Sequence, residues 1–154
     1  MKKILKKVIT KKVITKWKMG LKLVFKKYDE ESITFIVNKM PVVLLFRDIV
    51  SLRSDGNKTI YYLSNGKCVI RRLGLRYCCL DLPCNHFGRY HNTYVMNFHF
   101  YQEHSLKEIC VVKLFGGFSF VVSRYERERF YEDEKRYTAN EKSRIIRLNL
   151  KNRK

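Results

Sequence analysis

Short runs of β-branched and aromatic residues, separated by strong turn signals, fill the chain between Ser32 and Val122. The turn signals are Asn38-Lys39-Met40-Pro41, Asp55-Gly56-Asn57, Asn65-Gly66 and Gly116-Gly117. Strands separated by such closely spaced turns pair as antiparallel neighbours, and a proline between two runs cannot belong to a central strand. Asn65-Gly66 favours a two-residue type I′ hairpin, in which both central residues have positive φ. The predicted strands are residues 33–37, 42–46, 49–53, 59–63, 67–70, 98–101, 108–114 and 117–122.

Two segments depart from this pattern. Apolar residues recur at helical spacing between Leu73 and Leu82, directly before Pro83, which predicts a short helix there. From Arg124 onward, charges with interspersed aromatic residues predict a helix that leads into a basic tail. The predicted fold class is therefore mainly β, an elongated antiparallel sandwich or meander with one short inserted helix and helical basic segments at both ends.

Positive charge is concentrated at the two ends of the chain. Residues 1–28 contain 11 Lys and no acidic residue, and residues 135–154 contain 8 Lys or Arg and one Glu, whereas the middle is close to neutral. Such ends attract nucleic-acid phosphates or an anionic membrane, or simply solubilise the chain. The predicted organisation is a basic amphipathic segment over residues 1–31, a folded domain over residues 32–137 and a basic tail over residues 138–154.

The N-terminal segment contains the tandem repeat KKVIT-KKVIT over residues 6–15. Leu5, Ile9, Val13 and Trp17 follow at intervals of four and predict an apolar helical stripe flanked by Lys pairs. A basic amphipathic helix of this kind binds a membrane surface, another protein or DNA phosphates.

Several functional classes are disfavoured. No apolar stretch approaches the roughly 18 to 20 residues of a membrane span, and Lys recurs where a signal peptide needs its apolar region. With five cysteines and no export signal, we expect reduced thiols and a cytoplasmic location. Cys79, Cys84, His86 and His91 lack zinc-site spacing, so we expect no metal and no other cofactor. We expect no enzymatic activity, because a glycine-rich phosphate loop, paired carboxylates and a serine elbow are missing.

One block combines aromatic, histidine and asparagine residues: FGRYHNTYVMN at residues 87–97, followed by VVSR at residues 121–124. With the hairpin pattern of residues 46–71 and the short helix, this order of pieces resembles the LytTR DNA-binding domain over residues 33–136. Thr93 replaces the family's usual serine and keeps its hydroxyl. The positions that carry the resemblance are Arg89, His91, Thr93, Tyr94, Val95, Asn97, Ser123 and Arg124.

The resemblance implies stacked antiparallel sheets whose strand-end loops enter successive major grooves of DNA. Asparagine pairs bidentately with adenine, and arginine pairs bidentately with guanine. The first loop is then around Asn92, the second around Asn57 and the third around Arg124. The DNA-contact candidates implied in this way are Asn57, Lys58, Thr59, Arg89, His91, Asn92, Arg124 and Tyr125.

Each candidate also has a structural interpretation. The Asn92 side chain could support a turn, His91 could orient the loop or pack against a strand, and Arg89 could brace the scaffold or contact phosphate. Tyr125 departs from the family, which often has successive basic residues after the serine. The nearby Glu126 would repel the DNA backbone unless Arg127 neutralised it.

The resemblance implies a stand-alone transcription regulator that binds double-stranded promoter DNA sequence-specifically at direct repeats, with two copies per site. A membrane-protein inhibitor that engages the N-terminal segment is a further expected partner. The composition alone keeps two alternatives open, a general nucleic-acid or ribosome-associated basic binding protein and a peripheral membrane or interaction protein acting through the N-terminal helix.

Overall fold

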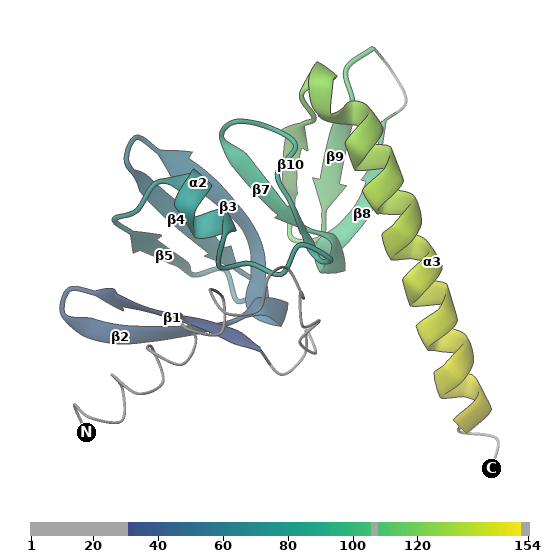
Figure 1. The fold of residues 1–154 in the computed structure, drawn as a ribbon, viewed down its shortest axis with the longest axis horizontal. Coiled ribbons are helices and arrows are strands. Elements are labelled where there is room, and N and C mark those ends of the chain that lie inside the picture. Colours follow the sequence, from purple (N-terminus) through teal and green to yellow (C-terminus); the bar gives the residue numbers. More distant parts are fainter. Residues whose placement is uncertain (1–30, 106–107, 152–154) are drawn as a thin grey trace, which may run out of the picture.

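The computed structural model describes residues 31–105 and 108–151, with side chains up to residue 142. In this part of the chain antiparallel strands form three sheets (Figure 1). The strands are β1 (Ser32–Val37), β2 (Met40–Leu45), β3 (Ile49–Asp55), β4 (Lys58–Leu63), β5 (Cys68–Arg71), β6 (Phe87–Gly88), β7 (Tyr94–Asn97), β8 (Tyr101–His104), β9 (Val111–Leu114) and β10 (Phe118–Val121). The helices are α2 (Leu75–Cys79) and α3 (Arg127–Lys151), with short 3-10 turns η2 (Phe46–Asp48), η3 (Phe98–Phe100) and η4 (Arg124–Glu126). The predicted stripe of Leu5, Ile9, Val13 and Trp17 lies outside the described residues.

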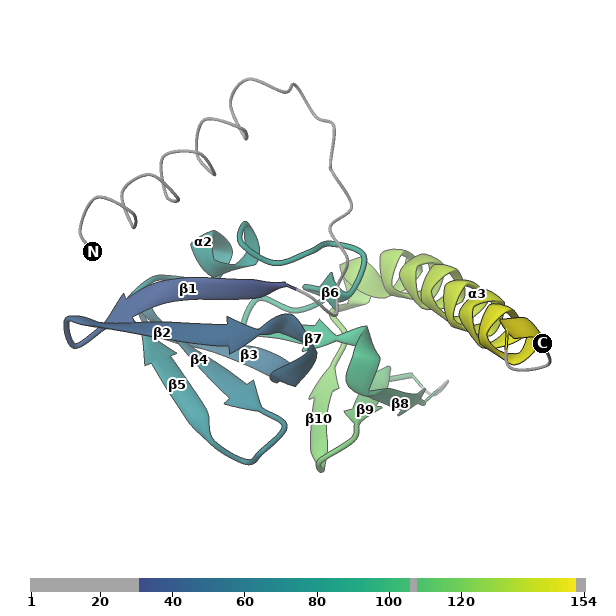
Figure 2. The same cartoon turned by 90° about the horizontal axis from the view of Figure 1, so that it is seen from below.

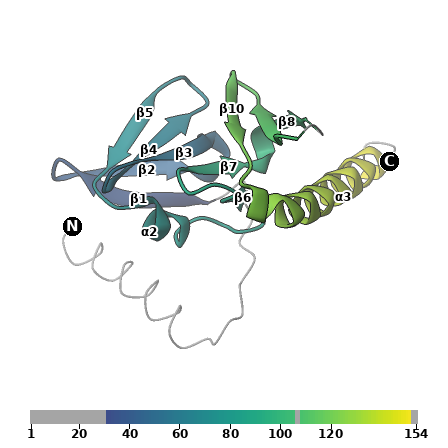
Figure 3. The same cartoon turned by 90° about the horizontal axis from the view of Figure 1, so that it is seen from above.

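A five-stranded sheet in the order β5-β4-β3-β7-β6 forms the middle of the molecule. The β1–β2 hairpin and α2 pack in one hydrophobic core with it, and the sheet β10-β9-β8 packs with the start of α3 in a second core. The β1–β2 hairpin and α3 lie at opposite ends of the long axis (Figures 2 and 3). This elongated arrangement of small antiparallel sheets with one short inserted helix confirms the predicted fold class.

The two cores meet at the central sheet because side chains at successive strand positions point to opposite faces. Val95 of β7 packs in the first core with Leu52, its register partner on β3. Met96, the next residue, packs in the second core with Val50. Strand β7, which forms the last four residues of the FGRYHNTYVMN block, is therefore held from both sides.

The first hairpin turns earlier than predicted. Asn38 and Lys39 alone form the turn, with φ of 49° and 66°, and Met40 and Pro41 belong to β2. Pro41 lies opposite Ile36 in a two-stranded sheet. Each strand of such a sheet has an unpaired edge, which accommodates a residue without an N–H group.

The type I′ turn predicted at Asn65-Gly66 is wrong. Only Gly66 has positive φ, at 80°. The Leu63 N–H donates to the carbonyl of Lys67 (2.9 Å), and the Gly66 N–H donates to that of Leu63 (3.0 Å). These bonds enclose a three-residue loop, and hairpin loops of this length place glycine at the left-handed position that ends them.

Residues 98–100, predicted to start a strand, form η3 instead, and β8 begins at Tyr101. Asn97 explains the difference, because its Oδ1 accepts a hydrogen bond from the His99 N–H (3.0 Å) and caps the turn. Its Nδ2 donates to the carbonyls of Phe46 (3.1 Å) and Ile49 (2.7 Å). The fully buried Asn97 thus ties the β2–β3 connection to the β7–β8 connection.

Helix α3 continues for 25 residues through Lys151, across the predicted boundary between residues 137 and 138. Phe130, Tyr131 and Tyr137 pack its first half against the second core. Among the described helices, none is both long and apolar enough to cross a membrane.

Gly88→Ala is expected to lower the free energy of unfolding by about 1 to 3 kcal/mol. A Cβ atom at Gly88 would overlap the ring of Tyr90. That ring is 1% exposed, and its hydroxyl donates to Asp133 (2.7 Å), so it has no room to move aside. Urea unfolding measures the loss, with Gly74→Ala as the control because its Cβ would meet Tyr77 only at an ordinary 3.8 Å. Equal stability of the wild type and Gly88→Ala would contradict this account.

Candidate nucleic-acid interface

Three loops lie along one edge of the molecule, at the top of Figure 1. They are residues 55–58 between β3 and β4, residues 89–93 between β6 and β7, and residues 123–126 between β10 and α3. We call residues 89–93 the first loop, residues 55–58 the second loop and residues 123–126 the third loop. Together they form the three-loop edge. All three predicted contact regions are therefore brought to the same edge.

Backbone hydrogen bonds fix the three loops relative to one another. The Ser54 N–H, at the end of β3, donates to the carbonyl of Thr93 (2.8 Å). The Ser123 N–H donates to the carbonyl of Tyr90 (2.7 Å), and the guanidinium of Arg129 donates to that of Arg89. The first loop thus has a direct bond to each of the other two regions, which preorganises the edge for a rigid partner.

Arg89 braces the first loop from inside. Its Nε donates to the carbonyl of His91 (3.4 Å) and its Nη2 to that of Asn92 (2.8 Å). These bonds occupy the backbone carbonyls of the loop and leave the Asn92 side chain exposed. Arg89 therefore supports the backbone of the loop, and the rest of its guanidinium N–H groups remain available for other contacts.

His91 orients the end of the same loop. Its Nδ1 lies 2.8 Å from the Thr93 hydroxyl and accepts from the Thr93 N–H (3.2 Å). Since Nδ1 accepts a hydrogen bond, the ring proton of the neutral imidazole lies on Nε2. The guanidinium of Arg53 lies over the ring of Tyr94, the residue after Thr93, at 5.8 Å from the ring centroid.

Of the three residues predicted to contact DNA from the second loop, two are exposed and one is buried. Asn57 lies exposed in the turn, and Lys58 is exposed at the start of β4. Thr59 is fully buried, and its hydroxyl donates to the carbonyl of Leu73 (2.8 Å). A side chain enclosed in this way cannot reach DNA, so the expected contact by Thr59 is corrected to a supporting role.

The third loop exposes both of its predicted residues. Arg124 is exposed, and the Tyr125 side chain is 95% exposed. Glu126, which would repel phosphate, forms an ion pair with Arg129 (2.9 Å). The positive charge of Arg124 therefore lies next to a neutralised pair rather than a free carboxylate.

Arg53 and Arg129 are surface arginines of the edge that the sequence did not single out. Arg53 lies on β3 opposite Tyr94, and Arg129 reaches both the Tyr90 ring (5.3 Å) and Glu126. Arg53 immediately precedes a turn on the exposed face of a strand, which was a usable signal. No pattern in the sequence marked Arg129, because its bond to the Arg89 carbonyl joins positions that are 40 residues apart.

The basic C-terminal residues lie away from this edge. Helix α3 begins next to the third loop and leads towards the opposite side of the molecule (Figure 1). At 1.5 Å per residue, its 25 residues span about 37 Å. The backbone of residues 144–151 is therefore remote from the three-loop edge.

Among the described residues, no three His, Cys, Asp or Glu side chains are grouped as metal ligands are. Cys79, Cys84, His86 and His91 therefore do not converge there. The five cysteines are all free thiols, of which Cys78 and Cys110 are buried.

Comparisons with known proteins find a likeness among solved structures. No family model and no curated protein matches the chain. Among solved structures, the chain is similar to the LytTr DNA-binding domain of a putative methyl-accepting/DNA response regulator from Bacillus cereus, with a TM-score of 0.58 and 15% sequence identity. The match covers 68% of this chain and 96% of that one. The chain therefore has the fold of a LytTR domain, as the resemblance of its motifs implied.

Proposed function

We propose that the chain is a sequence-specific double-stranded DNA-binding regulator of transcription that reads its site with the three-loop edge. The observation that carries this proposal is the joint placement of exposed Asn57, Asn92 and Arg124 on three loops that are hydrogen-bonded into one rigid edge. Amide and guanidinium groups are the side chains that recognise base edges in the major groove.

The edge also supplies groups for positioning on the DNA backbone. Lys58, Arg53 and Arg129 are exposed beside the base-reading candidates, and contacts of lysine and arginine with phosphate fix register without reading sequence. In the proposal, the three loops enter successive major grooves. Two copies then bind a promoter with direct repeats, acting in the cytoplasm.

A general nucleic-acid or ribosome-associated binding protein is the second candidate, favoured only by the basic ends of the chain. It predicts affinity that falls steeply with salt and does not depend on DNA sequence. Heparin competition separates the two candidates, because only a sequence-reading protein keeps its preference among DNAs when the competitor is added. The helical stripe of the N-terminal segment, and its binding to a membrane or to a membrane-protein inhibitor, remain predictions.

Asn92→Ala is expected to weaken binding to the preferred DNA by about 1 to 3 kcal/mol while leaving binding to scrambled DNA nearly unchanged. The reason is that a base-edge contact carries sequence information and a phosphate contact does not. Gel-shift titrations on both DNAs test this, with Asn140→Ala as the control because Asn140 is an exposed asparagine on α3. Equal losses on the two DNAs would make Asn92 a structural residue and remove it from the proposal.

A further inference from the structure

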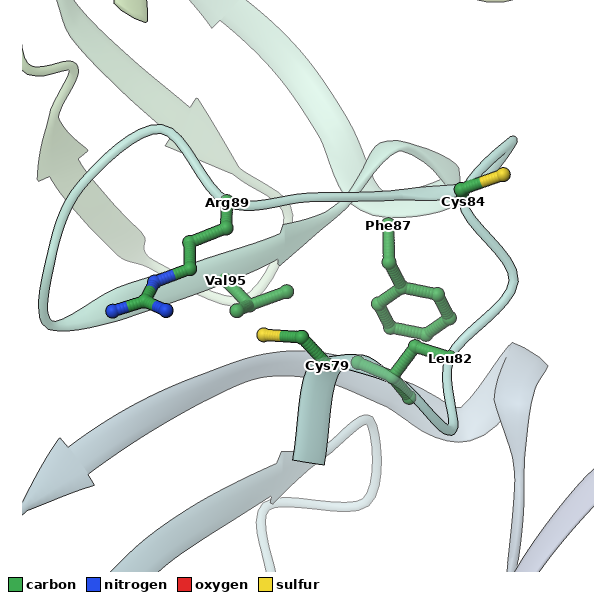
Figure 4. Close-up of a pocket in the computed structure, with 6 residues that line it drawn as sticks. All are labelled: Cys79, Leu82, Cys84, Phe87, Arg89 and Val95. Atoms are coloured by element: carbon green, nitrogen blue, oxygen red, sulfur yellow. The ribbon is translucent and has the colours of Figure 1, made fainter. Parts of the chain in front are cut away.

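A small pocket adjoins the first loop, with walls from α2 and the residues that follow it and from β6 and β7 (Figure 4). It has a volume of about 180 Å³. An apolar cavity of about 150 Å³ is large enough to hold one benzene ring, so this pocket admits a small ring or a short alkyl chain. The residues that line it are Cys79, Leu82, Cys84, Phe87, Arg89 and Val95.

The interior of this pocket is mainly apolar. Leu82, Phe87 and Val95 are buried residues of the first core. Figure 4 shows the Cys79 thiol directed towards Val95 and Arg89, whereas the Cys84 thiol points away from the other lining side chains. Cys79 therefore borders the interior, and Cys84 contributes only at the rim.

Arg89 brings a positive charge to this apolar space. Two of its groups donate to the loop carbonyls, but a guanidinium has five N–H donors. Within the described residues, Arg89 forms no ion pair with a carboxylate. Burial raises the pKa of the Cys79 thiol, and the charge of Arg89 opposes this rise, so the field of the guanidinium reaches the pocket interior.

We propose that this pocket binds a small carboxylate with an apolar body, and that binding weakens the grip of the first loop on DNA. The apolar body fills the space beside Cys79 and Val95, and the carboxylate pairs with Arg89. A carboxylate forms a stronger, bidentate bond with a guanidinium than a neutral carbonyl does. The ligand therefore competes with the carbonyls of His91 and Asn92, and the loop loses its brace.

The pocket is tested first without DNA, with benzoate as the probe for the full chain labelled with ¹⁵N. Saturable amide shifts at Cys79, Phe87 and Arg89 are expected, with a dissociation constant on the order of 1 mM for so small a ligand. Benzamide, the neutral isostere, should bind at least about fivefold more weakly, because it cannot pair with a guanidinium charge. Absence of saturable shifts, or equal binding of the two compounds, overturns the carboxylate site.

Two variants locate the site. Cys79→Phe fills the pocket and Arg89→Gln removes its charge, and each should abolish or strongly reduce the shifts caused by benzoate. Cys68→Ser is the matched control and should bind benzoate as the wild type does, because Cys68 is an exposed cysteine on β5 that does not line the pocket. If Cys79→Phe does not fold, Arg89→Gln alone decides the question, and undiminished benzoate binding by a folded Arg89→Gln refutes the assignment.

The coupling to DNA rests on the proposed function and is measured separately. Saturating benzoate should weaken binding of the preferred DNA by the wild type about fivefold or more, whereas benzamide at the same concentration should not. In Cys79→Phe, benzoate should have no effect. Benzoate binding without a change in DNA affinity overturns the coupling but not the pocket. A chain that binds benzoate and no DNA contradicts the proposed function instead.

Discussion

Phe130→Ala is expected to lower the free energy of unfolding by about 3 to 5 kcal/mol, the usual cost of removing a fully buried phenylalanine. Phe130 is 0% exposed and joins α3 to the second core. Its ring lies edge-on to those of Tyr90 (5.2 Å) and His104 (5.3 Å), and stacks on that of Phe98 at 6.2 Å. The alanine variant leaves a cavity beneath the first turn of α3, from which the third loop is positioned.

Chemical denaturation monitored by circular dichroism measures the Phe130→Ala effect. Glu132→Ala is the matched control, because Glu132 is exposed two residues further along the same helix. That control should change the stability by less than about 0.5 kcal/mol. A Phe130→Ala variant as stable as Glu132→Ala would show that α3 is not docked on the second core.

Asn97→Ala should cost about 2 to 4 kcal/mol of stability, because three backbone groups lose the hydrogen bonds that the fully buried Asn97 side chain forms with them. The carbonyls of Phe46 and Ile49 would lose the Nδ2 donor, and the His99 N–H would lose its acceptor. Phe46 and Ile49 lie in the turn between β2 and β3 and at the start of β3, and His99 lies in η3, which follows β7. The first loop leads directly into β7. Loss of Asn97 therefore weakens the support of β7 and of the first loop, which leads into it.

Thermal and urea unfolding of Asn97→Ala and Asn92→Ala compare two asparagines of the same motif. Asn97 is fully buried, whereas Asn92 is exposed. We expect Asn97→Ala to lose stability, and Asn92→Ala to keep wild-type stability while losing DNA preference. If both variants unfold at the wild-type urea concentration, the bonds of Asn97 contribute nothing measurable and this part of the account is wrong.

The local pattern of the chain was sufficient to predict most of the fold. Alternating β-rich runs predicted β3, β4 and β5 of the central sheet to within a few residues, since a strand with one buried face alternates apolar and polar residues. Strands β6 and β7 of the same sheet were not among the predicted strands. The turn at Gly66 was predicted in the wrong class, because the same Asn-Gly pair fits a two-residue and a three-residue loop. The difference depends on the bond between Leu63 and Lys67, which register decides.

The candidate site was predictable only in part, and for a related reason. Asn92 and Arg124 lie exposed where the motif placed them, because the motif fixes loop ends. Thr59 was misjudged since its partner, the Leu73 carbonyl, lies 14 residues away and becomes a neighbour only after folding. The brace formed by Arg89 and the contacts of Arg129 likewise depend on tertiary placement, which no local pattern encodes.

The central claim is that the three-loop edge reads DNA sequence. The most direct measurement is selection of binding sites from random double-stranded DNA by the full chain in the presence of heparin, followed by titration of the selected and scrambled sequences. We predict an enriched motif bound at least about 10³-fold more tightly than scrambled DNA. We also predict that a folded Asn57→Ala/Asn92→Ala/Arg124→Ala variant loses this preference but retains weak binding to both DNAs. Enrichment of no motif, or undiminished preference in the triple variant, would contradict the account.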